Sequence, residues 1–145
     1  MKIVTKDLLS VTEGVIFHQV NCQMAMNSGI AKAIREKWPI VYEEYLRFSR
    51  HFNHDFERLG QVLFVEVEQG LHIANIFGQL NYGYDGKRYK DYSALNSAFR
   101  NAEKAEPLGT YFPYNFGACR GGGDFKIIGR MIEYYFPEAI LCKFP

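Results

Sequence analysis

Two glycine-bearing loops, each lying between an apolar run and a segment of helical periodicity, constrain this chain more than any other feature. One spans residues 18–31 (His-Gln-Val-Asn-Cys-Gln-Met-Ala-Met-Asn-Ser-Gly-Ile-Ala), and the other spans 117–125 (Gly-Ala-Cys-Arg-Gly-Gly-Gly-Asp-Phe). A strand, a glycine turn and a helix N-terminus together expose backbone N–H groups and the positive end of a helix dipole, which attract anions. Two such loops in 145 residues predict a ligand with two phosphates, or with a phosphate and a ribose.

The composition indicates a folded globule. Apolar residues make up 48% of the chain and aromatic residues 16%, which argues against disorder, and the length suits one domain over residues 1–145. The net charge of +1, without a basic run, disfavours a nucleic-acid backbone as the partner. The ten tyrosines and twelve phenylalanines could stack on bases, but such residues usually form the core of a small domain.

The cysteines and the N-terminus bear on the compartment. The N-terminus lacks the apolar region of a signal peptide, and no stretch has the length of a membrane span. Cys22, Cys119 and Cys142 make an odd count without metal-ligand spacing, so neither a disulfide framework nor a metal site is expected. We expect a reduced, soluble, cytoplasmic protein without a metal or cofactor, whose modest size and charge suit a monomer.

Apolar periodicity predicts alternating strands and helices. The strands are expected over 1–4, 14–20, 61–68, 71–77, 111–116 and 139–144, and the helices over 28–37, 39–52, 92–105 and 124–136. Gln69-Gly70 is a hairpin signal between two of the strands. The pattern predicts an α/β protein with a mixed sheet between helical layers, and a ligand in the crevice beyond the strand ends. Strand order does not follow from this reasoning.

Asn21 and the start of the next helix are the candidates in the first loop. Asn21 ends a buried strand, where its amide suits paired ribose hydroxyls or instead caps the loop internally. Gly29 permits close approach, the N–H groups near Ile30 and Ala31 would face an anion, and Ser28 is a plausible N-cap.

His18 is a second candidate near the first loop. A lone histidine in a strand is usually structural. Its odd spacing from Asn21 places the two side chains on opposite faces unless the strand has already turned into the loop.

The second loop joins three glycines to a carboxylate. Gly121-Gly122-Gly123 lets the backbone wrap a phosphate closely. Asp124 is either an ordinary N-cap or a group that positions water and accepts a proton. Arg120 could meet a phosphate, although a surface role is common for arginine in a polar loop.

Two well-known nucleotide motifs are absent from the sequence. No Gly-Lys-Ser/Thr of a Walker A loop and no Gly-x-Gly-x-x-Gly of a Rossmann fingerprint occurs. Cys22 and Cys119 lie in the two loops, but nothing in the sequence indicates a lowered pKa that would make either a nucleophile.

Over nearly its whole length the chain resembles the macro domain family, an ADP-ribose-binding module with a three-layer α/β/α sandwich. Lys6-Asp7-Leu8-Leu9 is similar to the family's Gly-Asp-Ile/Leu segment, whose aspartate contacts adenine, with Lys6 in place of the glycine. Val20 to Ala31 is similar to the loop around the distal ribose, with Asn27 in place of its first glycine, and Gly117 to Phe125 to the phosphate-cradling loop. The resemblance, with the reasoning above, marks for ligand binding Asp7, Leu8, Asn21, Ser28, Gly29, Ile30, Ala31, Gly117, Ala118, Cys119, Arg120, Gly121, Gly122, Gly123 and Phe125.

Within the family, the His-x-x-Asn-Cys opening and the Gly-Gly-Asp-aromatic ending look most like small bacterial, phage and fungal members, several of which are regarded as ADP-ribose-1''-phosphate phosphatases. The resemblance therefore implies binding of ADP-ribose derivatives and phosphate removal, with His18, Asn21 and Asp124 as the catalytic candidates. One alternative is a hydrolase that releases ADP-ribose from a macromolecule, but the branch that does so from glutamate uses a lysine where this chain has Phe77-Gly78-Gln79. Another is a non-catalytic reader of ADP-ribose.

Overall fold

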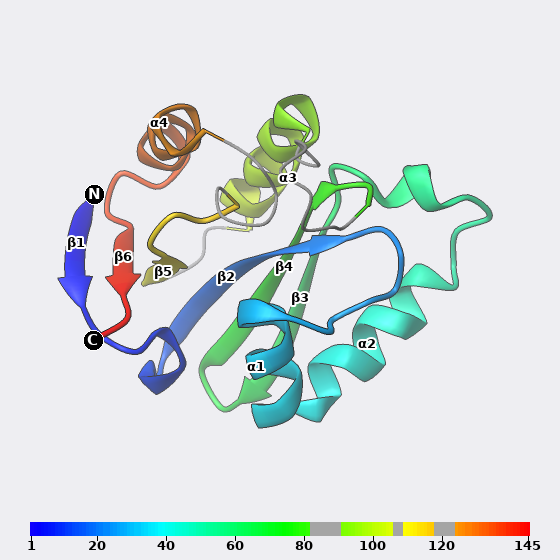
Figure 1. The fold of residues 1–145 in the computed structure, drawn as a ribbon, viewed down its shortest axis with the longest axis horizontal. Coiled ribbons are helices and arrows are strands. Elements are labelled where there is room, and N and C mark those ends of the chain that lie inside the picture. The colour runs from blue at the N-terminus through cyan, green and yellow to red at the C-terminus, as the bar shows by residue number, and fades with distance from the viewer. Residues whose placement is uncertain (82–90, 106–108, 118–123) are drawn as a thin grey trace.

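The computed structural model describes residues 1–81, 91–105, 109–117 and 124–145, which form a sheet with helices on both faces (Figure 1). The strands are β1 (Lys2–Thr5), β2 (Gly14–Asn21), β3 (Val62–Glu68), β4 (Leu71–Gln79), β5 (Thr110–Pro113) and β6 (Ile140–Lys143). The α-helices are α1 (Gly29–Lys37), α2 (Pro39–Ser49), α3 (Tyr92–Lys104) and α4 (Phe125–Tyr135), and the 3-10 helices are η1 (Leu8–Ser10) and η2 (Asp55–Arg58).

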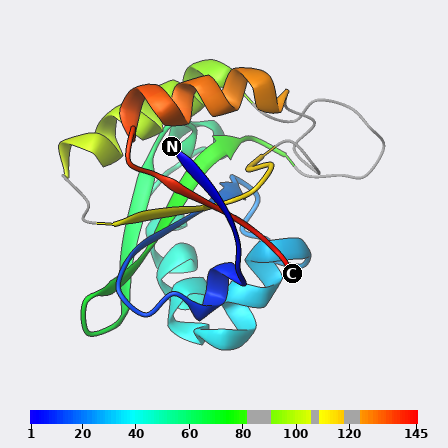
Figure 2. The same ribbon diagram turned by 90° about the vertical axis from the view of Figure 1, so that its left-hand side faces the viewer.

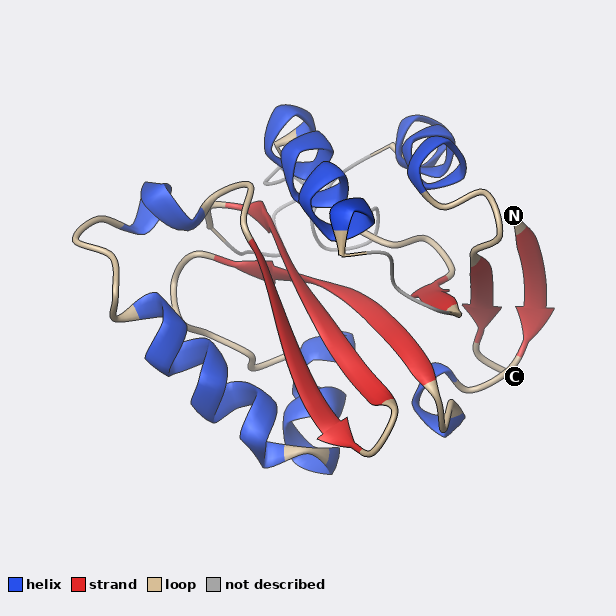
Figure 3. Cartoon of the chain, turned by 180° about the vertical axis from the view of Figure 1, so that it is seen from behind, coloured by secondary structure: helices blue, strands red, loops and turns tan. Residues whose placement is uncertain are grey.

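The six strands lie in the order β1-β6-β5-β2-β4-β3. Neighbouring strands are parallel except β3 and β4, which form the antiparallel hairpin predicted at Gln69-Gly70. The long strands β2, β4 and β3 lie side by side, as Figure 3 shows from behind. The predicted mixed sheet is therefore confirmed.

Each face of the sheet has its own hydrophobic core, because alternate residues of a strand point to opposite faces. On β2, Phe17 packs with residues of α3 and α4, whereas Ile16 and Val20 pack with residues of α1 and α2. Figure 2 shows the sheet between these two helical layers. Phe17 and Phe112 stack with ring centroids 4.5 Å apart. These layers confirm the expected α/β/α sandwich.

Two predicted elements extend too far. The strand expected over 111–116 ends at Pro113, because the chain turns through Asn115 (φ 62°) and Gly117 (φ 68°) in left-handed conformations that a strand cannot contain. The helix expected over 39–52 ends at Ser49. No helix in the described part of the chain is long and apolar enough to cross a membrane.

Candidate functional site

The described ends of the two glycine loops follow neighbouring strands of the sheet. The carboxyl end of β2 leads into α1 on one face of the sheet, whereas the helix that follows β5 is α4, on the other face. β2 and β5 are neighbours. The helices that follow these two adjacent parallel strands therefore lie on opposite faces of the sheet. Such a switch point opens a crevice beyond the strand ends, where α/β sheets bind their ligands.

Asp7 follows β1 at this same edge of the sheet. Its Oδ1 accepts a hydrogen bond from the Leu9 N–H at 3.0 Å, and Ser10 Oγ donates to its carbonyl at 2.6 Å, so Asp7 caps η1. The Asp7 side chain is exposed, whereas Leu8 is buried against the α1 and α2 core. The turn therefore holds an accessible carboxylate at the sheet edge.

Asn21 organises the first loop from within. Its Oδ1 accepts from the Gln23 N–H at 2.8 Å and from Tyr45 Oη at 3.1 Å, and its Nδ2 donates to the Ala25 carbonyl at 3.0 Å. Tyr45 Oη also donates to the Asn21 carbonyl at 2.7 Å. The register between β2 and β4 shifts at Val20/Asn21, so the strand has turned into the loop there. The Asn21 side chain therefore caps its own loop, which is one of the two roles that the sequence suggests. Contact of this side chain with a ribose remains a prediction.

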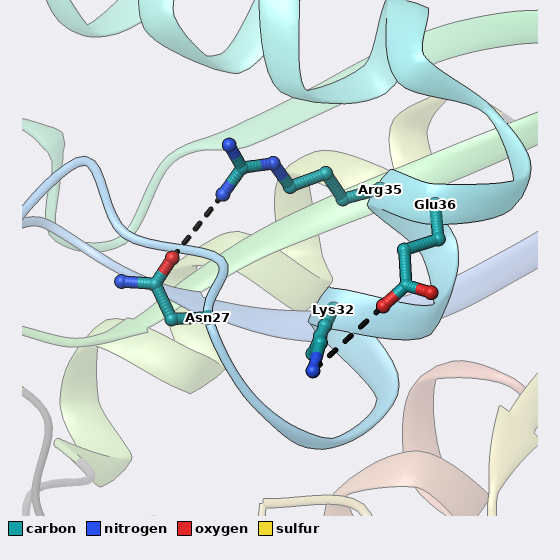
Figure 4. Close-up of polar contacts among 4 residues, drawn as sticks. All are labelled: Asn27, Lys32, Arg35 and Glu36. Atoms are coloured by element: carbon teal, nitrogen blue, oxygen red, sulfur yellow. Dashed lines mark hydrogen bonds and ion pairs between the residues drawn. The ribbon is translucent and has the colours of Figure 1, made fainter.

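The rear of the loop rests on α2. Burial raises the pKa of the Tyr45 phenol, so its hydroxyl stays protonated and donates. Tyr42 Oη donates to the Met24 carbonyl at 3.0 Å, and the Arg35 guanidinium lies 3.8 Å from the centre of the Tyr42 ring. Arg35 also donates to Asn27 Oδ1 at 3.2 Å (Figure 4). Asn27 is thereby tied to α1.

The N-terminus of α1 lacks the usual side-chain cap. Ser28 occupies the N-cap position with extended backbone, but its side chain makes no capping hydrogen bond. Gly29 has φ +61°, and a Cβ there would meet nothing within 4 Å, so conformation and not space favours glycine. Ile30 is exposed, and Ala31 is half-buried. The first N–H groups of α1 lack the acceptor that Ser28 could supply, a state that suits an anion.

Figure 4 also shows Lys32 and Glu36 of the same helix. Their charged groups are 3.9 Å apart and largely exposed, so this pair contributes little to stability.

Only the two ends of the second loop are described. At the start, Gly117 has φ +68°; at the end, Asp124 caps α4 by accepting from the Lys126 N–H at 2.8 Å through Oδ1. The Asp124 N–H donates to Tyr92 Oη at 2.7 Å, and Phe125 packs on Tyr114 with ring centroids 5.5 Å apart. The N-cap interpretation of Asp124 is confirmed, and its carboxylate is exposed.

Six of the predicted ligand-binding residues lie outside the described residues and stay predictions: Ala118, Cys119, Arg120, Gly121, Gly122 and Gly123. Residues 81–88 (Asn-Tyr-Gly-Tyr-Asp-Gly-Lys-Arg) are a polar, glycine-containing loop in the sequence, and all of them but Asn81 also lie outside the described residues.

His18 lies within the protein rather than at its surface. It is 1% exposed, and its Nε2 is 2.6 Å from Asn75 Oδ1. Because Asn75 Nδ2 donates to the Leu63 carbonyl at 3.0 Å, its Oδ1 faces His18 and Nε2 carries the proton. Burial lowers the pKa of His18 to about 4, so the ring is neutral, and its Nδ1 is buried without a hydrogen-bond partner. The structure does not bring His18 together with Asp124 at one exposed site.

Further residues at the site have no strong signal in the sequence. Gln79 ends β4 beside Asn21, accepts a hydrogen bond from Gln19 Nε2 and donates to the Asn81 carbonyl at 2.8 Å. Arg58 and Asp55 of η2 contact the first loop, although their segment is only a polar stretch in the sequence. Their roles depend on contacts between segments far apart in the chain, which local patterns do not encode.

The described residues contain no group of three or more His, Cys, Asp or Glu side chains arranged to hold a metal ion.

Solved structures that are similar to this arrangement of strands and helices include macrodomains. A protein of unknown function from Bacteroides thetaiotaomicron has a similar structure, with a TM-score of 0.85 at 21% identity over 98% of this chain and 96% of that one. The macrodomain of Mycobacterium tuberculosis DarG matches with a TM-score of 0.81 at 17% identity over 99% and 97%. No family model and no curated protein matches the sequence.

A structure solved with ADP-ribose is also similar. Thermosipho africanus DarTG in complex with ADP-ribose matches with a TM-score of 0.76 at 16% identity, over 99% of this chain and 41% of that one. At these identities the likeness establishes the macrodomain fold of this chain.

Proposed function

We propose that this protein binds ADP-ribose derivatives and hydrolyses the terminal phosphate of ADP-ribose-1''-phosphate. The observation that carries the proposal is the gathering of Asp7, Asn21 and the N-termini of α1 and α4 at one edge of the sheet, around a switch point. Asp7 would meet adenine, the two helix ends would meet the phosphates, and the loop after Asn21 would surround the distal ribose. The ADP-ribose in the similar Thermosipho africanus structure supports this choice of ligand.

The reaction requires water to attack phosphorus while the bond between phosphorus and the ribose oxygen breaks, giving ADP-ribose and inorganic phosphate. Of the two groups predicted to move the proton, we assign the role to Asp124, because its carboxylate is exposed and its capping bond uses only Oδ1. His18 is neutral and 1% exposed, so we assign it a structural role against Asn75. The uncapped N–H groups of α1 would stabilise the developing charge.

A non-catalytic reader is the second candidate. The amide of Asn21 is engaged within its own loop, and His18 is withdrawn from the crevice, so both are suited to shaping a pocket. Hydrolysis of ADP-ribose from a macromolecule has less support, since β4 ends in Gln79 where the resemblance would require a lysine.

Two assays separate these functions. Release of inorganic phosphate from ADP-ribose-1''-phosphate, with micromolar binding of ADP-ribose by calorimetry, would support the phosphatase, whereas binding without release would favour the reader. Asp124→Asn keeps an N-capping side chain but removes the carboxylate, so we expect it to bind ADP-ribose normally and to lose phosphate release. Full turnover by this variant would remove Asp124 from the mechanism. If the wild-type protein bound neither ligand, the proposed function would be wrong.

A further inference from the structure

Arg58, the last residue of η2, is a buried cation. It is only 4% exposed, and no carboxylate lies within ion-pair distance of it in the described part of the chain. Its two terminal nitrogens donate to main-chain carbonyls, one to Ser49 at 2.9 Å and the other to Cys22, while its buried Nε has no partner. Burying a charge in this way is unfavourable unless hydrogen bonds or an opposite charge compensate it, so the two carbonyls stabilise the guanidinium together with the Asp55 carboxylate, which interacts with it electrostatically.

These carbonyls belong to different parts of the fold. Ser49 ends α2, where the negative end of the helix dipole suits a cation. Cys22 directly follows Asn21, and its N–H donates to the Leu80 carbonyl at 3.1 Å. One guanidinium therefore joins η2, the end of α2 and the start of the first loop.

A second contact from η2 supports the same loop. Gln23 Nε2 lies 2.9 Å from Asp55 Oδ2 and 3.0 Å from the Leu80 carbonyl. The hydrogen bond from Gln23 lowers the pKa of Asp55, which keeps the carboxylate charged. Cys22 and Gln23 are thus held from one side by η2 and from the other by the chain after β4.

We propose that Arg58 is a positioning residue for the distal-ribose half of the ligand site. It sets the place of Cys22, and through Cys22 the place of Asn21 and the loop that leads to α1. A planar guanidinium can donate to two carbonyls at once, which a lysine ammonium at the same depth does not do with the same geometry. The adenine half rests on Asp7 and η1, whereas the hydrogen bonds of Arg58 to described residues go to Ser49 and Cys22. The inference rests on the proposed binding of ADP-ribose.

The test compares Arg58→Lys and Arg58→Met with Arg47→Met. Arg47 is a matched control, because its side chain is 68% exposed and its guanidinium pairs with Glu44 on α2. Calorimetry measures binding of ADP-ribose and of AMP, which has no distal ribose. We expect both Arg58 variants to weaken ADP-ribose binding by about tenfold or more, the loss typical of removing a charge-assisted hydrogen bond, and AMP binding to stay within about twofold. Arg47→Met should resemble wild type with both ligands.

Amide hydrogen exchange in the free protein gives an independent measurement. Residues 21–27 should exchange faster in Arg58→Lys than in Arg47→Met, while the buried amides of α3 stay protected. If Arg58→Met does not fold, Arg58→Lys decides. Unchanged exchange at 21–27, unchanged ADP-ribose affinity, or equal losses for AMP and ADP-ribose would each overturn the inference. Failure of the wild-type protein to bind ADP-ribose would instead refute the proposed function, and the exchange result would still test how Arg58 holds the loop.

Discussion

The two ends of the candidate ligand site are built in different ways. At the end proposed to meet adenine (the adenine end), the polar contacts of Asp7 reach residues only two or three positions along the chain. At the end proposed to meet the distal ribose (the ribose end), the first loop is held by partners 24, 36 and 57 positions away, on α2, η2 and the chain after β4. The adenine end is therefore a turn stabilised by local hydrogen bonds, whereas the ribose end depends on contacts that form only in the tertiary structure.

The largest expected effect is at Asn21. Asn21→Ala removes three hydrogen bonds of the side chain and leaves buried partners unsatisfied. The free energy of unfolding should fall by about 3 kcal/mol. Urea denaturation of this variant beside Asn27→Ala, whose exposed side chain has one such contact, measures the effect. Equal losses in the two variants would contradict the special role of Asn21 in holding the loop.

Acid should weaken the protein through His18. The unfolded chain binds this proton with a pKa near 6.5 and the folded protein with a pKa of about 4, so the unfolded state takes up more protons between these values. Stability is therefore lost as the pH falls below about 6.5, by about 2 kcal/mol between pH 7 and pH 5. Urea unfolding at both pH values should show a smaller loss in His18→Gln. The same loss in both proteins would assign the pH dependence to other groups.

A smaller effect is expected from the tyrosine hydroxyls behind the loop. Tyr45→Phe removes a buried donor to Asn21 and should lower the free energy of unfolding by about 1.5 kcal/mol. Tyr42→Phe removes the bond to the Met24 carbonyl, at a more exposed position, and should lower it by about 0.5 kcal/mol. Thermal unfolding of the two variants measures which one loses more stability. A larger loss in Tyr42→Phe than in Tyr45→Phe would contradict the expectation that the buried hydrogen bond contributes more than the exposed one.

The smallest effect on stability is expected at the adenine end. Asp7→Asn keeps an N-capping side chain on an exposed turn, so the free energy of unfolding should change by less than about 0.5 kcal/mol. Binding of AMP and of ADP-ribose should nevertheless weaken together, because both carry adenine. Calorimetry with the two ligands tests this, and a loss confined to ADP-ribose would move Asp7 away from adenine.

The sequence predicts the ligand-facing ends of the site better than their supports. The apolar run before Asn21 and the cap at Asp124 are local patterns, and both are present in the structure. Arg58 is an ordinary charged residue in a polar stretch, and only its burial against Cys22 and Ser49 gives it significance. The aromatic run predicts a longer strand β5 than the structure has. The strand ends at Pro113 because the chain takes a left-handed turn at Asn115.

By itself, the sequence determined the alternation of strands and helices, the hairpin at Gln69-Gly70 and the position of both glycine loops between a strand and a helix. These features depend on periodicity and turn residues within short segments. Only the tertiary structure decided that β2 and β5 are neighbours, that Tyr45 and Arg58 hold the loop after Asn21, and that His18 is buried against Asn75. The physical reason is that strand pairing and burial depend on contacts between residues far apart in the chain, which no local pattern specifies.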